Sequence, residues 1–154
     1  MEINIIEADK SDLETILELQ KECYLSEAEL HDDFDIPPLK QDMVSILNEY
    51  NKGIFLKAVN DSTIIGSVRG YSLNETCYIG KLIVKNGFQN NGIGKLLMIS
   101  IENKFGHCKR YELFTGFKSQ KNLYLYNKLG YKEFNREKIN NKLTLVYLEK
   151  DKTF

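Results

Sequence analysis

Cysteine and histidine are both scarce in this 154-residue chain, which limits the kinds of site it can form. The 3 cysteines, Cys23, Cys77 and Cys108, are an odd number and include no CxxC pair. We therefore expect neither a disulfide framework nor a zinc site. His31 and His107 lie far apart and fit no metal-ligand spacing. The sequence predicts buried free thiols and no metal.

The chain also lacks a charge excess, a long apolar run and a targeting segment. Its formal net charge is −1, and its lysines and arginines form no cluster that could neutralise phosphates, which argues against a nucleic-acid partner. No apolar stretch approaches the ~18 residues that span a membrane. Residues 1–12 contain no basic region followed by an apolar run, as a signal peptide would. We therefore expect a cytoplasmic protein without a membrane partner.

What the sequence does contain is typical of one globular domain. Hydrophobic residues make up 42% of the chain and charged residues 28%, which is ordinary for a folded protein. A chain of this length buries roughly two-thirds of its surface on folding. No internal repeat, low-complexity segment or Gly/Ser linker divides it. We expect residues 1–154 to form a single domain.

Strand and helix patterns alternate along the whole chain. Apolar and β-branched runs predict strands at 3–6, 54–59, 63–72, 76–85, 111–116, 131–139 and 143–150. Helical spacing predicts helices after Ser11, at 43–50, at 93–105 and after Ser119. Ser11 and Glu14 form a predicted capping box, and the acidic, proline-containing segment 27–38 breaks the first helical pattern. Because only the later part alternates strictly, we expect an α/β fold with a mixed sheet.

Residues 89–95, QNNGIGK, lie between the predicted strand at 76–85 and the most amphipathic helix. Gly92 and Gly94 allow positive φ and a close approach to a ligand, and the unpaired N–H groups of a helix start attract anions. These features predict a cradle for a pyrophosphate. Asn91-Gly92 would also suit a β-hairpin turn, but the residues that follow have helical periodicity. The segment lacks the GxGxxG and GKS/T patterns of other nucleotide sites.

Two segments resemble the motifs of a known family. Residues 82–98, LIVKNGFQNNGIGKLLM, resemble the acetyl-CoA-binding motif of the GNAT acetyltransferase superfamily, whose core is Q/R-x-x-G-x-G/A. Residues 123–131, LYLYNKLGY, are similar to its second motif, and the order of elements matches along the whole chain. The resemblance implies the GNAT fold, which is α/β of the α+β type. Its mixed, mostly antiparallel central sheet has about seven strands, flanked by about four helices.

The resemblance implies an acetyl-CoA-dependent N-acetyltransferase. Such an enzyme moves the acetyl group to a primary amine of a small molecule, peptide or protein. It does so by direct attack in a ternary complex, because a bound thioester is already activated and positioning supplies much of the rest. Acetyl-CoA is then the co-substrate, no metal is required, and the protein is a monomer or a homodimer. A non-catalytic sensor that binds acetyl-CoA is the alternative.

The same resemblance assigns residues to the coenzyme. The pyrophosphate would be held by the backbone N–H groups of Gln89, Asn90, Asn91, Gly92, Ile93, Gly94 and Lys95. The pantetheine arm would pair with Leu82, Ile83 and Val84. Ser119, where the family often has asparagine, or Asn122 one turn later would contact that arm, although each could equally serve as a cap or a solvated helix position.

Tyr126 aligns with the general acid of the family. A phenol can hydrogen-bond the sulfur and give up its proton as the thiolate leaves. The alternative is that Tyr126 only packs, because Tyr124 and Tyr131 lie close to it in the sequence.

The other catalytic roles are less defined. A bulge near Gly80 would free a backbone N–H for the developing oxyanion, and the expected donor is Leu82. For the base, three options stay open: Glu75 acting through water, Tyr78, or no dedicated base.

Two signals on the acceptor conflict. In the family, the segment between the first two helices often lines the acceptor site, and here it is acidic: Glu27, Glu29, Asp32, Asp33 and Asp35. These carboxylates would attract a cation, or they only solvate a loop. Arg69 and Tyr71 on a neighbouring strand instead favour an acceptor with a carboxylate, such as an amino acid. The sequence leaves the acceptor open.

Overall fold

The computed structural model describes residues 2–152, and its frame is a seven-stranded sheet. The strands are β1 (Asn4–Glu7), β2 (Ile54–Asn60), β3 (Thr63–Leu73), β4 (Thr76–Val84), β5 (Arg110–Gly116), β6 (Lys132–Lys138) and β7 (Thr144–Asp151). They lie in the order β1-β2-β3-β4-β5-β7-β6, and among these described strands only β4 and β5 pair in parallel. The expected mixed, mostly antiparallel sheet is confirmed.

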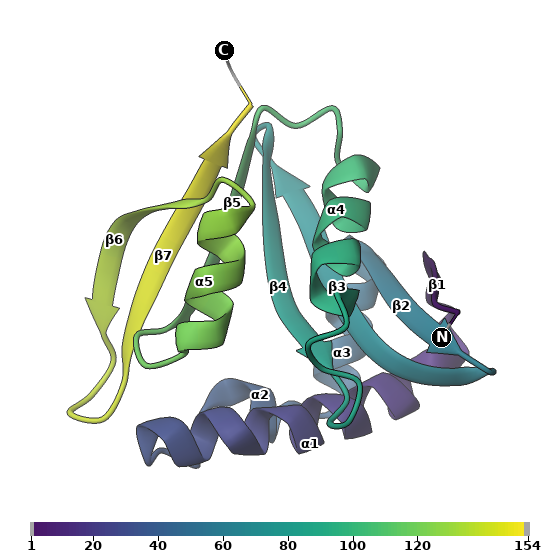
Figure 1. Ribbon diagram of the computed structural model, residues 1–154, viewed down its shortest axis with the longest axis horizontal. Coiled ribbons are helices and arrows are strands. Elements are labelled where there is room, and N and C mark those ends of the chain that lie inside the picture. The colour runs from purple at the N-terminus through teal and green to yellow at the C-terminus, as the bar shows by residue number, and fades with distance from the viewer. Residues whose placement is uncertain (1, 153–154) are drawn as a thin grey trace.

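Helices cover both faces of the sheet. They are α1 (Leu13–His31), α2 (Pro37–Lys40), α3 (Met43–Lys52), α4 (Ile93–Lys104) and α5 (Gln120–Lys128). Figure 1 shows α4 and α5 on one face, α3 on the other, and α1 across one end of the strands. The four expected helices are present, and α2 is a further short one that begins with proline. Proline suits that position because the N–H it lacks would have no helical acceptor.

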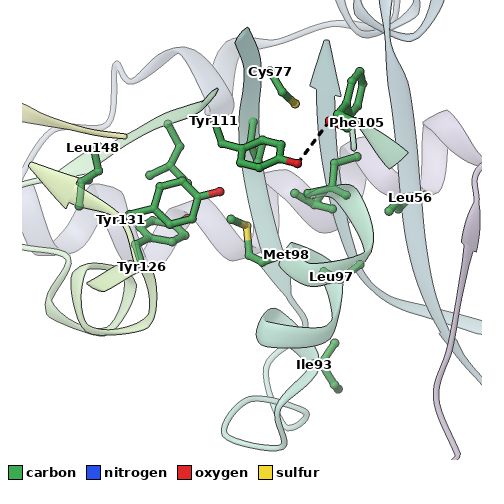
Figure 2. Packing of buried hydrophobic residues seen from close by; sticks show 14 of the residues in the cluster. Leu56, Cys77, Ile93, Leu97, Met98, Phe105, Tyr111, Tyr126, Tyr131 and Leu148 are labelled. Atoms are coloured by element: carbon green, nitrogen blue, oxygen red, sulfur yellow. Dashed lines mark hydrogen bonds between the residues drawn. The ribbon is translucent and has the colours of Figure 1, made fainter. Parts of the chain in front are cut away.

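The larger hydrophobic core lies between α4, α5 and the sheet. The periodicity that predicted α4 marks its buried face, where Ile93, Leu97 and Ile101 are at most 1% exposed. Figure 2 shows Ile93 and Leu97 in one cluster with Leu56 and Cys77 from the strands, and Ile101 belongs to the same cluster. Truncating such a residue to alanine typically costs about 2–5 kcal/mol. This packing fixes α4, and with it the loop before it, next to β4.

A smaller core holds α1 and α3 against the other face. Leu13 and Ile16 of α1 and Ile46 of α3 are fully buried in a cluster with Phe55 of β2. The following turns of α1 therefore lie in a fixed position across the end of the sheet.

Both ends of α1 differ from the sequence-based expectation. Ser11 lies inside a 3-10 turn, η1 (Lys10–Asp12), and Asp12 takes the N-cap position of α1. The Asp12 carboxylate accepts the N–H of Asp9 at 2.7 Å, which closes the turn ahead of the helix. At its other end α1 continues into the acidic segment as far as His31 and ends within it, at Asp32, a residue in the left-handed conformation with φ 51°. Aspartate tolerates that conformation better than most residues.

The predicted bulge is present in β4. Ser67 pairs with Ile83 and Arg69 pairs with Gly80, so two steps along β3 correspond to three along β4. The positive φ of 49° in this region belongs to Lys81, whereas an added Cβ at Gly80 would meet nothing within 4 Å. Gly80, which pointed to the bulge, therefore lies beside it, and Lys81 adopts the strained conformation with positive φ.

Candidate active site

β4 and β5 separate after a short paired segment. Their parallel ladder joins only Thr76–Tyr78 to Arg110–Glu112, while β5 stays paired with β7 as far as Gly116. The bulge adds twist that turns the second half of β4 away from β5. Figure 1 shows the two strands apart near α1. A pocket of about 550 Å³ lies in this opening, lined from α1, α3, α5, the central strands and the β6–β7 hairpin.

One face of α1 forms a wall of this pocket. Tyr24, Glu27 and His31 all line it, because helical spacing brings residues three and four apart to the same side. The Tyr24 hydroxyl makes no hydrogen bond within residues 2–152. Burial raises the pKa of Tyr24 despite the nearby positive charge of Arg69. The wall therefore presents a protonated, uncommitted phenol close to a carboxylate.

Neighbouring groups hold Glu27 in position. The Ser119 hydroxyl donates a hydrogen bond to Glu27 Oε2, and His31 Nδ1 lies 3.8 Å from the same oxygen. The backbone N–H of Lys118 donates to His31 Nε2 at 3.2 Å, so we assign the ring proton to Nδ1, which lies 3.0 Å from the Glu27 carbonyl. Gly116 leaves room for the ring, because a Cβ there would collide with it.

Tyr126 on α5 reaches the same pocket from the other face of the sheet. Its side chain is almost fully buried, beside Tyr131 with ring centroids 6.1 Å apart (Figure 2). Its hydroxyl makes no hydrogen bond within the described residues. Burial raises the pKa of Tyr126, and Tyr24 and Glu27 raise it further. The hydroxyl is thus protonated, unpaired and next to the pocket, where a ligand could accept its hydrogen bond.

A buried charge cluster forms another part of the lining. Arg69 on β3 donates to Gln20 Oε1 at 2.6 Å and to Gln41 Oε1 and Glu49 Oε2, each at 3.2 Å. Lys81 Nζ lies 3.4 Å from Glu49 Oε1. Burial alone would raise the pKa of Glu49, but Arg69 and Lys81 offset it and hold that pKa below its usual value. The cluster therefore contains one ionised carboxylate between two cations.

The loop before α4 has the geometry expected of an anion cradle. Gly92 takes the N-cap position with φ 78°, and Asn90 also has positive φ, 65°. The first helical hydrogen bond runs from the Leu96 N–H to the Gly92 carbonyl at 3.0 Å, so the N–H groups just before Leu96 have no helical acceptor. The Gln89 side chain donates to the Val84 carbonyl at 3.1 Å and ties the loop to β4. A helix follows Asn91-Gly92, so the hairpin alternative is wrong.

Four of the residues that the sequence assigned to catalysis or to the coenzyme line the pocket: Tyr78, Leu82, Asn122 and Tyr126. Ser119 does not, because it is 3% exposed and its hydroxyl is taken by Glu27. Asn122 donates to Thr115 Oγ1 at 3.3 Å and stays at the pocket wall. Of the two alternatives for the pantetheine contact, the geometry favours Asn122.

Glu75 lies away from the pocket, contrary to its suggested role as a base. It forms the β3–β4 turn with Asn74, both residues having positive φ. Its side chain is 65% exposed and lies 3.4 Å from Lys109 Nζ. Glu75 sits at the closed end of the β4–β5 pair, whereas the pocket lies where the strands have separated.

Of the five carboxylates that the sequence placed in the acidic segment, all within the described residues, Glu27 alone lines the pocket. Asp33 accepts hydrogen bonds from Asn140 Nδ2 at 2.9 Å and from the Asp35 N–H at 3.0 Å, and both lower its pKa. Asp35 pairs with Lys40 at 3.1 Å on the surface. Asp33 and Asp35 therefore hold surface elements together and do not line the pocket.

Three pocket residues were not predicted from the sequence: Tyr24, Glu49 and Lys81. Tyr24 stands out in the sequence only as part of the periodic face of α1. Glu49 and Lys81 come from different elements and meet because α3 packs against α1 and β2, so no local pattern could have paired them. Within residues 2–152, no group of His, Cys, Asp and Glu side chains could hold a metal ion, and no helix is long and apolar enough to cross a membrane.

Comparison with known proteins adds a family and a fold. The model of the Acetyltransferase (GNAT) family matches residues 13–131. No curated protein sequence matches the chain significantly. Among solved structures, PaiA N-acetyltransferase from Thermoplasma acidophilum, in complex with coenzyme A, has a TM-score of 0.79 and 22% identity over 98% of this chain and 99% of its own. Ribosomal-protein-S18-alanine N-acetyltransferase from Escherichia coli has a TM-score of 0.81 and 9% identity, covering 99% and 96%. A GNAT family acetyltransferase from Elizabethkingia anophelis with acetyl-CoA bound has 0.74 and 22%, covering 97% of each chain.

Proposed function

Because this chain belongs to the acetyltransferase (GNAT) family, we propose that it transfers an acetyl group from acetyl-CoA to a primary amine. The amine attacks the thioester directly in a ternary complex, without a covalent enzyme intermediate. The observation that carries the proposal is the opening between β4 and β5, where the unpaired Tyr126 hydroxyl meets the pocket. Similar structures crystallised with coenzyme A or acetyl-CoA support the choice of coenzyme.

The open edge of β4 supports binding of the pantetheine arm. The Lys85 N–H bonds to the Ile65 carbonyl of β3 at 2.7 Å. Backbone groups alternate in direction along a strand, so the Val84 N–H points toward the opening, while the Val84 carbonyl accepts from the Gln89 side chain at 3.1 Å. The arm would bind along this edge like an added strand, with the pyrophosphate on the free N–H groups at the start of α4.

Tyr126 is proposed to assist the leaving group. As the carbon–sulfur bond breaks, the sulfur gains negative charge, and a phenol placed against it donates a hydrogen bond and shares its proton. The raised pKa of Tyr126 keeps the hydroxyl protonated throughout the neutral range. The carbonyl oxygen gains charge earlier in the reaction, and the Leu82 N–H beside the bulge is the proposed donor to it.

Glu27 is proposed to receive the amine. Its carboxylate lines the pocket and contributes to the raised pKa of Tyr126, so the two groups lie close to each other. An ammonium group would be drawn to this carboxylate, and Glu27 can accept the proton that the ammonium must lose before its lone pair attacks the thioester. The proton that the nitrogen loses after the carbon–nitrogen bond has formed passes to solvent. The Ser119 hydroxyl holds the Glu27 carboxylate in position by donating a hydrogen bond to it. This role replaces Glu75, and Tyr78 remains a pocket residue without an assigned proton transfer.

The test is acetyl-CoA-dependent release of free thiol with a panel of primary amines, together with the shift in melting temperature that acetyl-CoA causes. We expect turnover with at least one amine and a clear shift. Gly92→Val should abolish the shift, because its side chain would enter the pyrophosphate site and a branched residue is strained at φ 78°. Binding without turnover would favour the sensor alternative. A folded Gly92→Val protein with normal acetyl-CoA affinity would refute the loop assignment.

A further inference from the structure

The pocket contains a positively charged cluster for which the proposed reaction has no use. Arg69 and Lys81 share a single carboxylate, that of Glu49, at 3.2 and 3.4 Å. The side chain of Arg69 is 5% exposed and that of Lys81 24%. Unbalanced charge in such a place is costly unless a partner arrives. The cluster therefore favours an added anion.

Lys81 is the member of the cluster that is free to bind a ligand. Arg69 is already fixed by Gln20, Gln41 and Glu49, and its guanidinium lies 4.4 Å from the centre of the Phe55 ring. Among residues 2–152, Lys81 makes one long hydrogen bond, to Glu49 at 3.4 Å, although an ammonium group has three donors. Its pKa is lowered by burial and by the charge of Arg69, more than Glu49 offsets. A carboxylate from the pocket would relieve that imbalance.

The other pocket carboxylates lie apart from this cluster. Glu112 is paired with Arg110 at 2.8 Å, and Glu27 is hydrogen-bonded to Ser119 near Tyr126. Gln20, which contacts Arg69, and Glu27 lie on the same helix, α1, so both ends of the pocket are held by one element. The pocket thus has a cationic end and a separate carboxylate near the reacting atoms, an arrangement that complements a zwitterion.

Two pairs of aromatic side chains form another part of the lining. Tyr71 and Tyr78, register partners on β3 and β4, stack with centroids 5.2 Å apart. Phe114 and Tyr147, register partners on β5 and β7, lie 5.5 Å apart on the other side of the opening. All four side chains line the pocket. They offer apolar surface to a ligand of similar character.

We propose that the acceptor of the transfer proposed above is an amine that also carries a carboxylate and an aromatic or large aliphatic group, and that Lys81 binds the carboxylate. The amine then lies at Glu27 and the apolar group rests between the two aromatic pairs. Arg69 and Glu49 act as positioning residues, since they hold Lys81 at the pocket and do not touch the acceptor. This assignment rests on the proposed function and adds the substrate class.

The experiment compares amines that differ only by the carboxylate, such as phenylalanine with 2-phenylethylamine and leucine with isoamylamine. Wild-type protein should prefer the carboxylated member of each pair by at least about tenfold in kcat/KM, the effect expected of one charge-assisted hydrogen bond. Lys81→Met keeps the length of the side chain and removes its charge. It should erase this preference and leave the shift caused by acetyl-CoA unchanged. Lys104→Met, which removes an exposed lysine 3.1 Å from Glu7, should keep the preference.

A binding measurement covers the case in which the rates are too low to compare. N-acetylphenylalanine and N-acetyl-2-phenylethylamine are titrated calorimetrically into the complex with coenzyme A, using wild type and Lys81→Met. Tighter binding of the acid, lost in Lys81→Met, supports the proposal. Equal binding of both ligands, or an unchanged preference in Lys81→Met, overturns it. If the amines without a carboxylate are acetylated with the same kcat/KM as the carboxylated members of their pairs, only this inference fails. If acetyl-CoA itself does not bind, the proposed function fails with it.

Discussion

Tyr126 and Tyr131 form a matched pair that can separate catalysis from packing. Both are buried and their rings are 6.1 Å apart. The Tyr131 hydroxyl donates to Glu102 Oε2 at 2.8 Å, whereas the Tyr126 hydroxyl has no partner within residues 2–152. Replacing each by phenylalanine removes one oxygen and keeps the ring, so the two variants should respond in opposite ways.

The expected magnitudes follow from these partners. Tyr131→Phe loses a hydrogen bond to a charged group, which is worth about 1–2 kcal/mol and roughly 3–6 °C in Tm. Tyr126→Phe breaks no hydrogen bond within the described chain, so its stability should change by no more than about 0.5 kcal/mol. If Tyr126 assists the leaving thiolate, kcat should fall by about 10²–10⁴-fold. Tyr131→Phe should leave kcat nearly unchanged.

The assay measures kcat with saturating acetyl-CoA and an acceptor from the panel, beside thermal unfolding with and without acetyl-CoA. Tyr126→Phe should keep its Tm and its acetyl-CoA shift while losing rate. A rate loss below about threefold would remove Tyr126 from the mechanism and leave positioning to account for catalysis. If Tyr131→Phe loses as much kcat as Tyr126→Phe, both residues affect the rate through packing.

Two further predictions concern carboxylates and alkaline pH. Glu27→Gln should lower kcat at least about tenfold, whereas Asp35→Asn, on the adjacent surface, should leave both kcat and the acceptor KM unchanged. An equal loss of kcat in the two variants would refute the role of Glu27. Burial raises the pKa of Cys23 to about 11 and those of Cys77 and Tyr111 to about 12, from 9.0 for the thiols and 10.0 for the phenol. Unfolded chains therefore lose protons first, so stability should be constant below about pH 8.5 and fall above it, by roughly 6 kcal/mol at pH 11. Urea unfolding measured from pH 7 to pH 11 tests this, and a flat profile would contradict it.

Local patterns in the sequence were sufficient for much of the fold. Ile93, Leu97 and Ile101 recur at the helical period because they form the buried face of α4, so the pattern and the packing have the same cause. The glycines at 92 and 94 identified the start of that helix, since few other residues adopt the conformation found at Gly92. Local signals were weaker at α1, where Asp12 and not Ser11 precedes the helix. Both residues are good caps, and only the surrounding turn decides between them.

The sequence by itself determined the order of strands and helices, the loop before α4 and, through resemblance, the family. The tertiary structure decided which side chains share the pocket. The separation of β4 from β5 excludes Glu75, which lies at their closed end. The position of α1 across the open end brings in Glu27, and the packing of α3 brings Glu49 to Lys81. Such contacts join residues far apart in the chain, and they depend on the relative placement of whole elements, which no local periodicity or turn signal records.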